Sequence, residues 1–131
     1  MTLEFKVSTF IPATPENIYA AWLDSQKHAE MTGGTANVNA IVGEDFQAWD
    51  GYIEGVNLEL IPNEKIVQSW RTVDFTESEE DSHLEITLLQ VENGTKITII
   101  HSNLPPHGGQ YQSGWDESYF QPMKNYFEDR K

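Results

Sequence analysis

The residues best suited to chemistry in this sequence are aromatic side chains that recur in its second half. They are Trp70 on a predicted strand and, at the spacing of one helix face, Trp115, Tyr119 and Tyr126, a face that also carries Met123. If the strand face that carries Trp70 meets that helix face, these side chains line the space between them. Aromatic walls with polar tips suit a ligand that is mostly apolar and hydrogen-bonded at one end. The same rings could instead simply fill the core.

His101 is the residue most able to act as an acid or a base. It ends a predicted strand that contains Ile97 and Ile99, and strand alternation turns its imidazole to the same side as those isoleucines. There it could anchor the polar end of a ligand, titrate near neutral pH, or be a hydrogen-bonded core residue. His107 lies in a loop rich in proline and glycine, which could cover the opening of a cavity or be merely exposed.

Other catalytic and metal chemistries lack the residues that they need. The chain has no cysteine, which excludes disulfides, thiolate catalysis and cysteine-ligated zinc, so the H-x-E pattern at His28 is not a zinc deaminase motif. Serine occurs in no G-x-S-x-G context, and the glycines form no phosphate-binding loop. Asp81, His83 and Glu85 have no recognised ligand spacing. The sequence therefore predicts no metal site and no cofactor.

The charge of the chain excludes two classes of partner. Its 131 residues include 21 acids and 8 bases, a net charge of −13, which repels phosphate backbones and anionic lipid. No apolar run reaches membrane-spanning length and the N-terminus has no signal core, so we expect a cytoplasmic protein with no nucleic-acid or membrane partner. Arg71 adjoins Trp70 but points the other way, and we interpret it as the ion-pair partner of a nearby acid. The acidic run at residues 77–81 is expected to lie in solvent.

Local patterns predict the elements that position these residues in the first third of the chain. Residues 3–11 alternate between apolar and polar, as a half-buried strand does. Thr14 as N-cap and Pro15 at the first helical position begin a short helix, and Asp24 begins a second one that Gly33 ends.

The rest of the chain completes an α+β pattern. From about residue 35 to residue 103 the sequence is typical of antiparallel strands joined by short turns, and an amphipathic helix that Pro122 should bend closes the chain. We therefore predict one domain over residues 1–131. It consists of a strongly curved antiparallel sheet of about six to seven strands wrapped around a long C-terminal helix, with two short helices after the first strand.

Several short motifs resemble one known family in the expected order along nearly the whole chain. They are residues 14–22 (TPENIYAAW), 24–33, 49–53 (WDGYI), 66–71 (IVQSWR), 114–115 and 119–127 (YFQPMKNYF). These motifs resemble the START-like (SRPBCC) superfamily, and more closely the homologues of the heat-shock protein 90 ATPase activator. The resemblance implies a helix-grip fold, in which sheet and helix commonly enclose a hydrophobic cavity that binds lipids, hormones or polyketides in different members. The eukaryotic activator also has an N-terminal chaperone-contacting domain, for which we expect no counterpart in this chain.

The leading hypothesis is a non-enzymatic START-like domain that binds a small apolar or amphipathic molecule between the sheet and the helix. The candidate lining residues are Trp70, Ile97, Ile99, His101, Trp115, Tyr119, Met123 and Tyr126. One alternative is a protein-interaction role as a co-chaperone or stress-response module, with a chaperone or another protein as partner. The other is a cyclase- or hydrolase-like enzyme, which would need His101 beside a carboxylate or a tyrosine.

Overall fold

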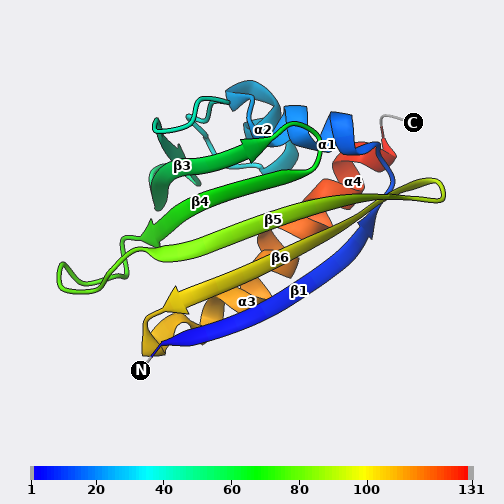
Figure 1. Ribbon diagram of the computed structural model, residues 1–131. Coiled ribbons are helices and arrows are strands. Elements are labelled where there is room, and N and C mark those ends of the chain that lie inside the picture. The colour runs from blue at the N-terminus through cyan, green and yellow to red at the C-terminus, as the bar shows by residue number, and fades with distance from the viewer. Residues whose placement is uncertain (1, 130–131) are drawn as a thin grey trace.

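The sheet is a single antiparallel meander, and one long helical segment crosses its inner face (Figure 1). A computed structural model describes residues 2–129. The strand order is β1-β6-β5-β4-β3-β2, so only β1 joins the sheet out of sequence order. The strands are β1 (Leu3–Ile11), β2 (Asp45–Ala48), β3 (Ile53–Ile61), β4 (Lys65–Thr72), β5 (Ser82–Val91) and β6 (Gly94–Leu104). The predicted α+β helix-grip architecture is confirmed, with six strands.

The two N-terminal helices begin where the sequence predicts, and the second also ends at the predicted glycine. Helix α1 (Pro15–Trp22) is capped by Thr14, whose hydroxyl accepts a hydrogen bond from the Asn17 amide at 3.2 Å. Helix α2 (Ser25–Thr32) is capped by Asp24, and its last residue is followed by Gly33 in the left-handed conformation, φ +94°. Such caps satisfy backbone groups that a helix end leaves without partners.

The C-terminal helical segment is continuous over residues 106–128, but it is not uniform. It consists of the 3-10 turn η1 (Pro106–Gly109), α3 (Gln110–Trp115), the π-helical turn η2 (Asp116–Phe120) and α4 (Gln121–Glu128). Pro122 has no amide hydrogen to donate to the preceding turn, and its ring crowds that turn, so the helix widens there. The predicted perturbation at Pro122 therefore takes the form of a π turn. Because that turn holds an extra residue, the adjacent Tyr119 and Phe120 are both buried.

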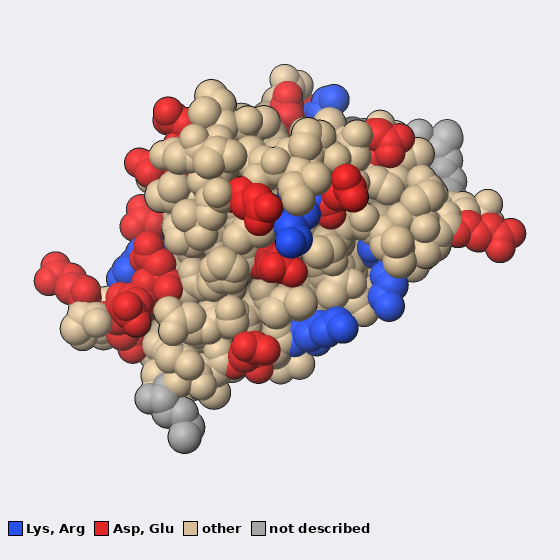
Figure 2. All heavy atoms as spheres, viewed as in Figure 1, with Lys and Arg blue, Asp and Glu red and all other residues tan. Residues whose placement is uncertain are grey.

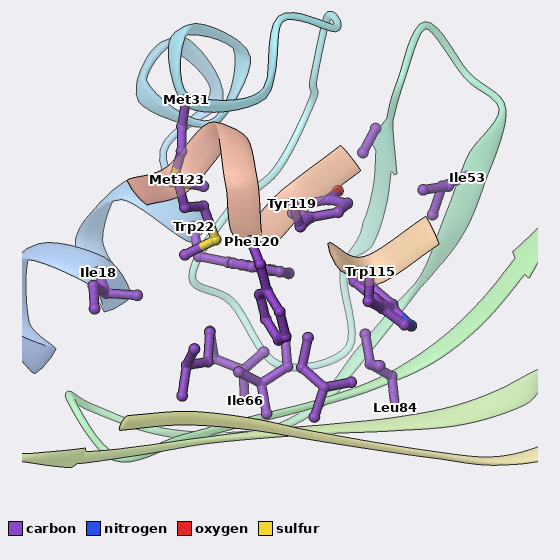
Figure 3. Packing of buried hydrophobic residues seen from close by; sticks show 14 of the residues in the cluster. Ile18, Trp22, Met31, Ile53, Ile66, Leu84, Trp115, Tyr119, Phe120 and Met123 are labelled. Atoms are coloured by element: carbon purple, nitrogen blue, oxygen red, sulfur yellow. The ribbon is translucent and has the colours of Figure 1, made fainter. Parts of the chain in front are cut away.

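The core lies between the inner face of the sheet and this helical segment (Figure 3). Ile66, Ile86 and Ile99 on three neighbouring strands are almost fully buried, and Figure 3 shows Phe120 pointing from the helix toward Ile66. Complete burial of such side chains contributes about 1.5–3 kcal/mol each. Within residues 2–129, no helix is long and apolar enough to cross a membrane.

Candidate functional site

One pocket of about 270 Å³ opens between the helix and the β2–β4 end of the sheet. Its walls come from the β2–β3 turn, from β3 and β4, and from α3 and η2; in Figure 3, Ile53, Trp115 and Tyr119 face this space. The lining residues are Trp49, Tyr52, Ile53, Trp70, Tyr111, Gly114, Trp115, Ser118 and Tyr119. Six of these nine residues are aromatic and none is charged, so the pocket is an aromatic enclosure with a few hydroxyl and indole groups.

The structure brings together only some of the candidate residues. Trp70, Trp115 and Tyr119 line the pocket. The others lie elsewhere: Ile97, Ile99, His101 and Met123 are completely buried in the core and Tyr126 faces a separate groove beside α1 and α4. These five predicted residues therefore do not line this pocket. Strand alternation does turn Ile97 and Ile99 inward, but the helix covers them fully, so no open space remains above them.

Three aromatic lining residues were absent from the predicted set. Trp49 and Tyr52 flank the turn between β2 and β3, and Tyr111 lies one helical turn before Trp115. The helical spacing that selected Trp115 and Tyr119 also includes Tyr111 and could have found it. Nothing local in the sequence shows that the β2–β3 turn folds over the helix.

The aromatic walls support one another through angled ring contacts. The Trp70 ring lies 4.9 Å from that of Tyr111 at an interplanar angle of 80°, and the Trp115 ring lies 4.9 Å from that of Tyr119 at 44°. Edge-to-face and tilted arrangements suit the ring quadrupoles. The rings therefore hold each other in position around the pocket.

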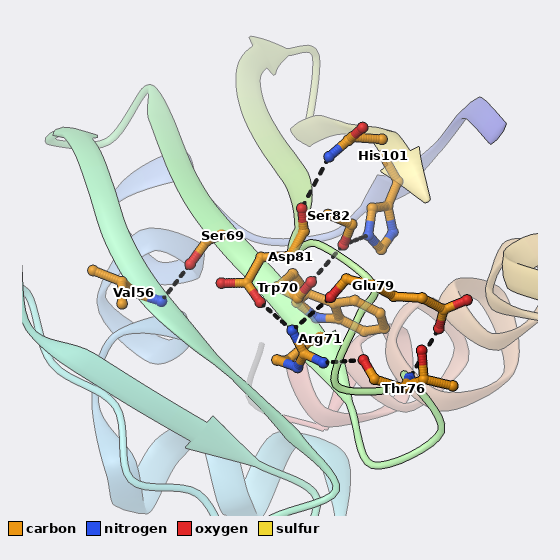
Figure 4. A network of polar contacts seen from close by, with 10 residues as sticks. Val56, Ser69, Trp70, Arg71, Thr76, Glu79, Asp81, Ser82 and His101 are labelled. Atoms are coloured by element: carbon orange, nitrogen blue, oxygen red, sulfur yellow. Dashed lines mark hydrogen bonds and ion pairs between the residues drawn. The ribbon is translucent and has the colours of Figure 1, made fainter. Parts of the chain in front are cut away.

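His101 lies behind the wall and connects two of its tryptophans, Trp115 directly and Trp70 through Ser82. Figure 4 shows the side of this connection that runs through Ser82 to Trp70. The Trp115 indole N–H donates to His101 Nδ1 at 3.0 Å, so the ring proton must sit on Nε2, which donates to Ser82 Oγ at 2.8 Å. Ser82 Oγ in turn donates to the Trp70 carbonyl at 2.6 Å. Burial, with a smaller effect of nearby His83, lowers the pKa of His101 to about 3. His101 is thus a neutral connector inside the protein and does not titrate near neutral pH, contrary to one of the hypotheses above.

A second buried histidine holds Tyr119. His28 Nδ1 lies 2.8 Å from the Trp22 carbonyl, which can only accept, so Nδ1 carries the proton and Nε2 accepts from the Tyr119 hydroxyl at 3.0 Å. Burial lowers the pKa of His28 and raises that of Tyr119. Both groups are therefore neutral at physiological pH. The indole N–H of Trp49, beside Tyr119, is buried without a well-formed hydrogen bond to any described residue.

One acidic side chain is hydrogen-bonded to the pocket lining, and another follows a lining residue in the chain. The Tyr52 hydroxyl donates to Asp74 Oδ2 at 2.6 Å, and burial raises the pKa of Tyr52. Asp50 accepts hydrogen bonds from the side chain and the backbone amide of Thr35, which lower its pKa. Asp50 is therefore a carboxylate at neutral pH.

Arg71 points away from the pocket and organises the acidic loop between β4 and β5 (Figure 4). Its guanidinium contacts Asp81 Oδ1 at 2.7 Å and donates to the carbonyls of Glu79 and Thr76. The interpretation of Arg71 as an ion-pair partner is confirmed. His107 joins the same loop through Glu79 Oε1 at 2.9 Å.

The described residues offer no obvious catalytic or metal-binding cluster. Within residues 2–129, no group of three or more His, Asp or Glu side chains could hold a metal ion. The hydrogen-bond partners of His28 and His101 are hydroxyl groups, an indole and a carbonyl, without a carboxylate. The arrangement therefore supports binding better than acid–base catalysis.

Comparison with known proteins identifies relatives along most of the chain. Residues 12–128 match the family model described as "Activator of Hsp90 ATPase homolog 1-like protein". The human activator of 90 kDa heat shock protein ATPase homolog 1 is 25% identical over 120 residues, which are 91% of this chain and 35% of the human protein. The chain spans about a third of the length of the curated relatives it matches.

Solved structures give the same result for the fold. An HSP90 activator from Plasmodium falciparum superposes with a TM-score of 0.86 at 25% identity and covers 96% of both chains. The Aha1 dimer from Colwellia psychrerythraea superposes with a TM-score of 0.73 at 21% identity, covering 86% of this chain and 87% of that one. Because the Colwellia protein is only 21% identical, its structure is evidence for the fold alone.

Proposed function

We propose, from its membership of the activator of Hsp90 ATPase homolog 1-like family, that this chain is a non-enzymatic START-like binding domain. In its fold, a helix lies across a curved sheet. Its ligand is a small apolar or amphipathic molecule held between helix and sheet. The observation that carries this proposal is the pocket of about 270 Å³, with six aromatic walls and no charged lining residue. The cytoplasmic location expected from the sequence remains a prediction.

The size and lining of the pocket indicate what it can hold. A dry cavity of about 150 Å³ takes up benzene, so 270 Å³ accommodates roughly two fused rings or a compact branched group. Burial of apolar surface favours binding by about 25 cal/mol per Å², before the cost of ordering the ligand. Ser118 supplies a hydroxyl on the wall that can orient one polar end.

Substitution of Gly114 by leucine should block the pocket and leave the fold intact. Gly114 lines the pocket from α3, and a Cβ added there meets no atom within 4 Å. Leucine is also the better helix former by up to about 1 kcal/mol. We expect Gly114→Leu to unfold at the same temperature as the wild type or higher, and to lose binding of indole and naphthalene, measured by calorimetry and by quenching of tryptophan fluorescence.

The matched control is Gln112→Leu, which places the same side chain on the exposed side of α3. This variant should bind indole and naphthalene as the wild type does. Equal binding by Gly114→Leu, or no binding of any apolar probe by the wild type, would contradict the proposed function.

A second candidate function, binding to a chaperone, is supported by an exposed apolar loop as well as by the family. Ile41 and Val42 are each 57% exposed, and Leu58 on the neighbouring strand is 46% exposed. Beneath them the buried Asn57 side chain donates to the carbonyls of Asn39 and Ile41. A loop held by buried hydrogen bonds while it presents apolar side chains is suited to protein contact.

The charge around this loop indicates the kind of partner. Residues 33–64 contain no Lys, Arg or His, and their acids are Glu44, Asp45, Asp50, Glu54, Glu59 and Glu64. In Figure 2 acidic side chains are spread over the outer face of the sheet, and basic ones occupy only a few places. Such a surface attracts a protein whose binding face is apolar at its centre and basic at its rim.

If this second function holds, the double variant Ile41→Asp, Val42→Asp should bind the heat-shock protein 90 of the same cell at least about tenfold more weakly, because central apolar contacts dominate such interfaces. Pull-down at low salt and the chaperone's ATPase rate measure the effect. Val73→Asp, at a valine after β4 that is 71% exposed, is the control and should leave binding unchanged. Absence of binding by the wild-type protein removes this candidate function.

A further inference from the structure

The pocket walls present aromatic rings from several directions. The rings belong to Trp49, Tyr52, Trp70, Tyr111, Trp115 and Tyr119. They differ in orientation: Trp70 and Trp115 are inclined by 43°, and Trp49 and Tyr119 by 76°. The face of an aromatic ring carries partial negative charge, and rings on several sides of one space together attract a cation placed there.

Negative charge also lies next to the pocket, in a chain whose net charge is −13. The exposed Asp74 accepts a hydrogen bond from the hydroxyl of the lining residue Tyr52. Three further exposed acids, Asp50, Asp116 and Glu117, are neighbours of lining residues in the sequence. Arg71 is the one Lys or Arg within two residues of any lining residue, and it points outward to Asp81. An anionic ligand would therefore approach against the local potential, whereas a cation would be drawn in.

From these observations, and resting on the proposed function of the pocket, we infer that the ligand carries an alkylammonium group and that this group enters the aromatic enclosure. A quaternary or tertiary ammonium is the best fit, because its alkyl groups bury apolar surface while its diffuse charge faces the rings. A primary ammonium is a poorer fit, since the walls offer it no carboxylate to replace lost hydration. A trimethylammonium group has the bulk of a tert-butyl group, which 270 Å³ accommodates with a few further carbons.

The deciding experiment compares two ligands that share a shape and differ in charge. Choline and 3,3-dimethylbutan-1-ol are isosteric, but only choline is a cation. We expect choline to bind at least about tenfold more tightly, measured by calorimetry and by tryptophan fluorescence at fixed ionic strength. Gly114→Leu should abolish binding of both ligands, which assigns the signal to this pocket.

A conservative variant at the rim tests the electrostatic part. Asp74→Asn keeps an acceptor for the Tyr52 hydroxyl and removes one negative charge. It should weaken choline binding roughly two- to threefold and leave binding of the alcohol unchanged.

The outcomes separate this inference from the function on which it rests. Equal affinity for the two isosteres, or tighter binding of the alcohol, overturns the ammonium inference while the pocket remains a binding site. Binding of naphthalene or indole without binding of choline also overturns the ammonium inference and leaves the pocket as a binding site. Failure of every apolar and cationic probe overturns both.

Discussion

Lowering the pH from 6 to 4 should reduce the free energy of unfolding by about 1.4 kcal/mol per pH unit through His101 alone. The pKa of this imidazole is lowered from 6.5 to about 3 by burial, so in this window the unfolded chain binds a proton that the folded protein does not. The contribution of His101 to the free energy of unfolding is therefore fully present above pH 6.5 and is lost as the pH falls toward 3. Protonation would also place a second donor at Nδ1, which already accepts from the Trp115 indole. His28, with a pKa also lowered by burial, adds to the loss.

Chemical denaturation at several pH values measures this slope, and variants assign it. His101→Phe removes the titrating group, so its slope should be shallower than that of the wild type by about 1.4 kcal/mol per pH unit. If that variant does not fold, His101→Asn serves instead, because its amide side chain does not titrate. Gln112→Ala, an exposed change on α3 that removes no titratable group, should keep the wild-type slope. Identical slopes in the wild type and His101→Phe would contradict the assignment.

Trp115→Ala should lower the free energy of unfolding by about 3–5 kcal/mol, the range for large aromatic side chains removed from a core. Trp115 is 3% exposed, and its ring contacts those of Trp22, Trp70 and Tyr119. Since it also forms one wall of the pocket, the cavity left behind merges with the binding site. Binding of indole and naphthalene should therefore weaken along with the stability.

Trp115→Phe separates packing from hydrogen bonding at this position. The smaller ring keeps most apolar contacts but leaves His101 Nδ1 buried without a donor, which costs about 1–3 kcal/mol. Gln112→Ala, an exposed change on the same helix, should stay within about 0.5 kcal/mol of the wild type. Urea denaturation followed by circular dichroism compares the three variants. A Trp115→Phe protein as stable as Gln112→Ala would show that the His101 hydrogen bond contributes little.

The helix caps show why parts of this fold could be predicted. Thr14 and Asp24 each accept a hydrogen bond from an amide three residues later. Likewise, residues 3–11 alternate between apolar and polar, which predicts a single strand with one buried face. These interactions involve near neighbours in the chain, so their residue types carry the information.

Other features of the site depend on contacts between distant residues. His28 and Tyr119, which share a buried hydrogen bond, are separated by 91 positions. The π turn before Pro122 buries both Tyr119 and Phe120. A regular amphipathic helix would bury only residues spaced three or four apart. A pattern along the chain contains neither fact.

Residue patterns were enough to predict the α+β fold, the elements and their caps, the aromatic stripe of the final helix and the acidic surface. That Trp70, Trp115 and Tyr119 line a pocket while Ile97, Ile99 and His101 are buried beneath the helix became visible only in the folded domain. Periodicity sets which side of an element faces inward. Whether an inward side chain meets open space or another side chain depends on where the opposite layer sits, and that is set by packing across the whole domain.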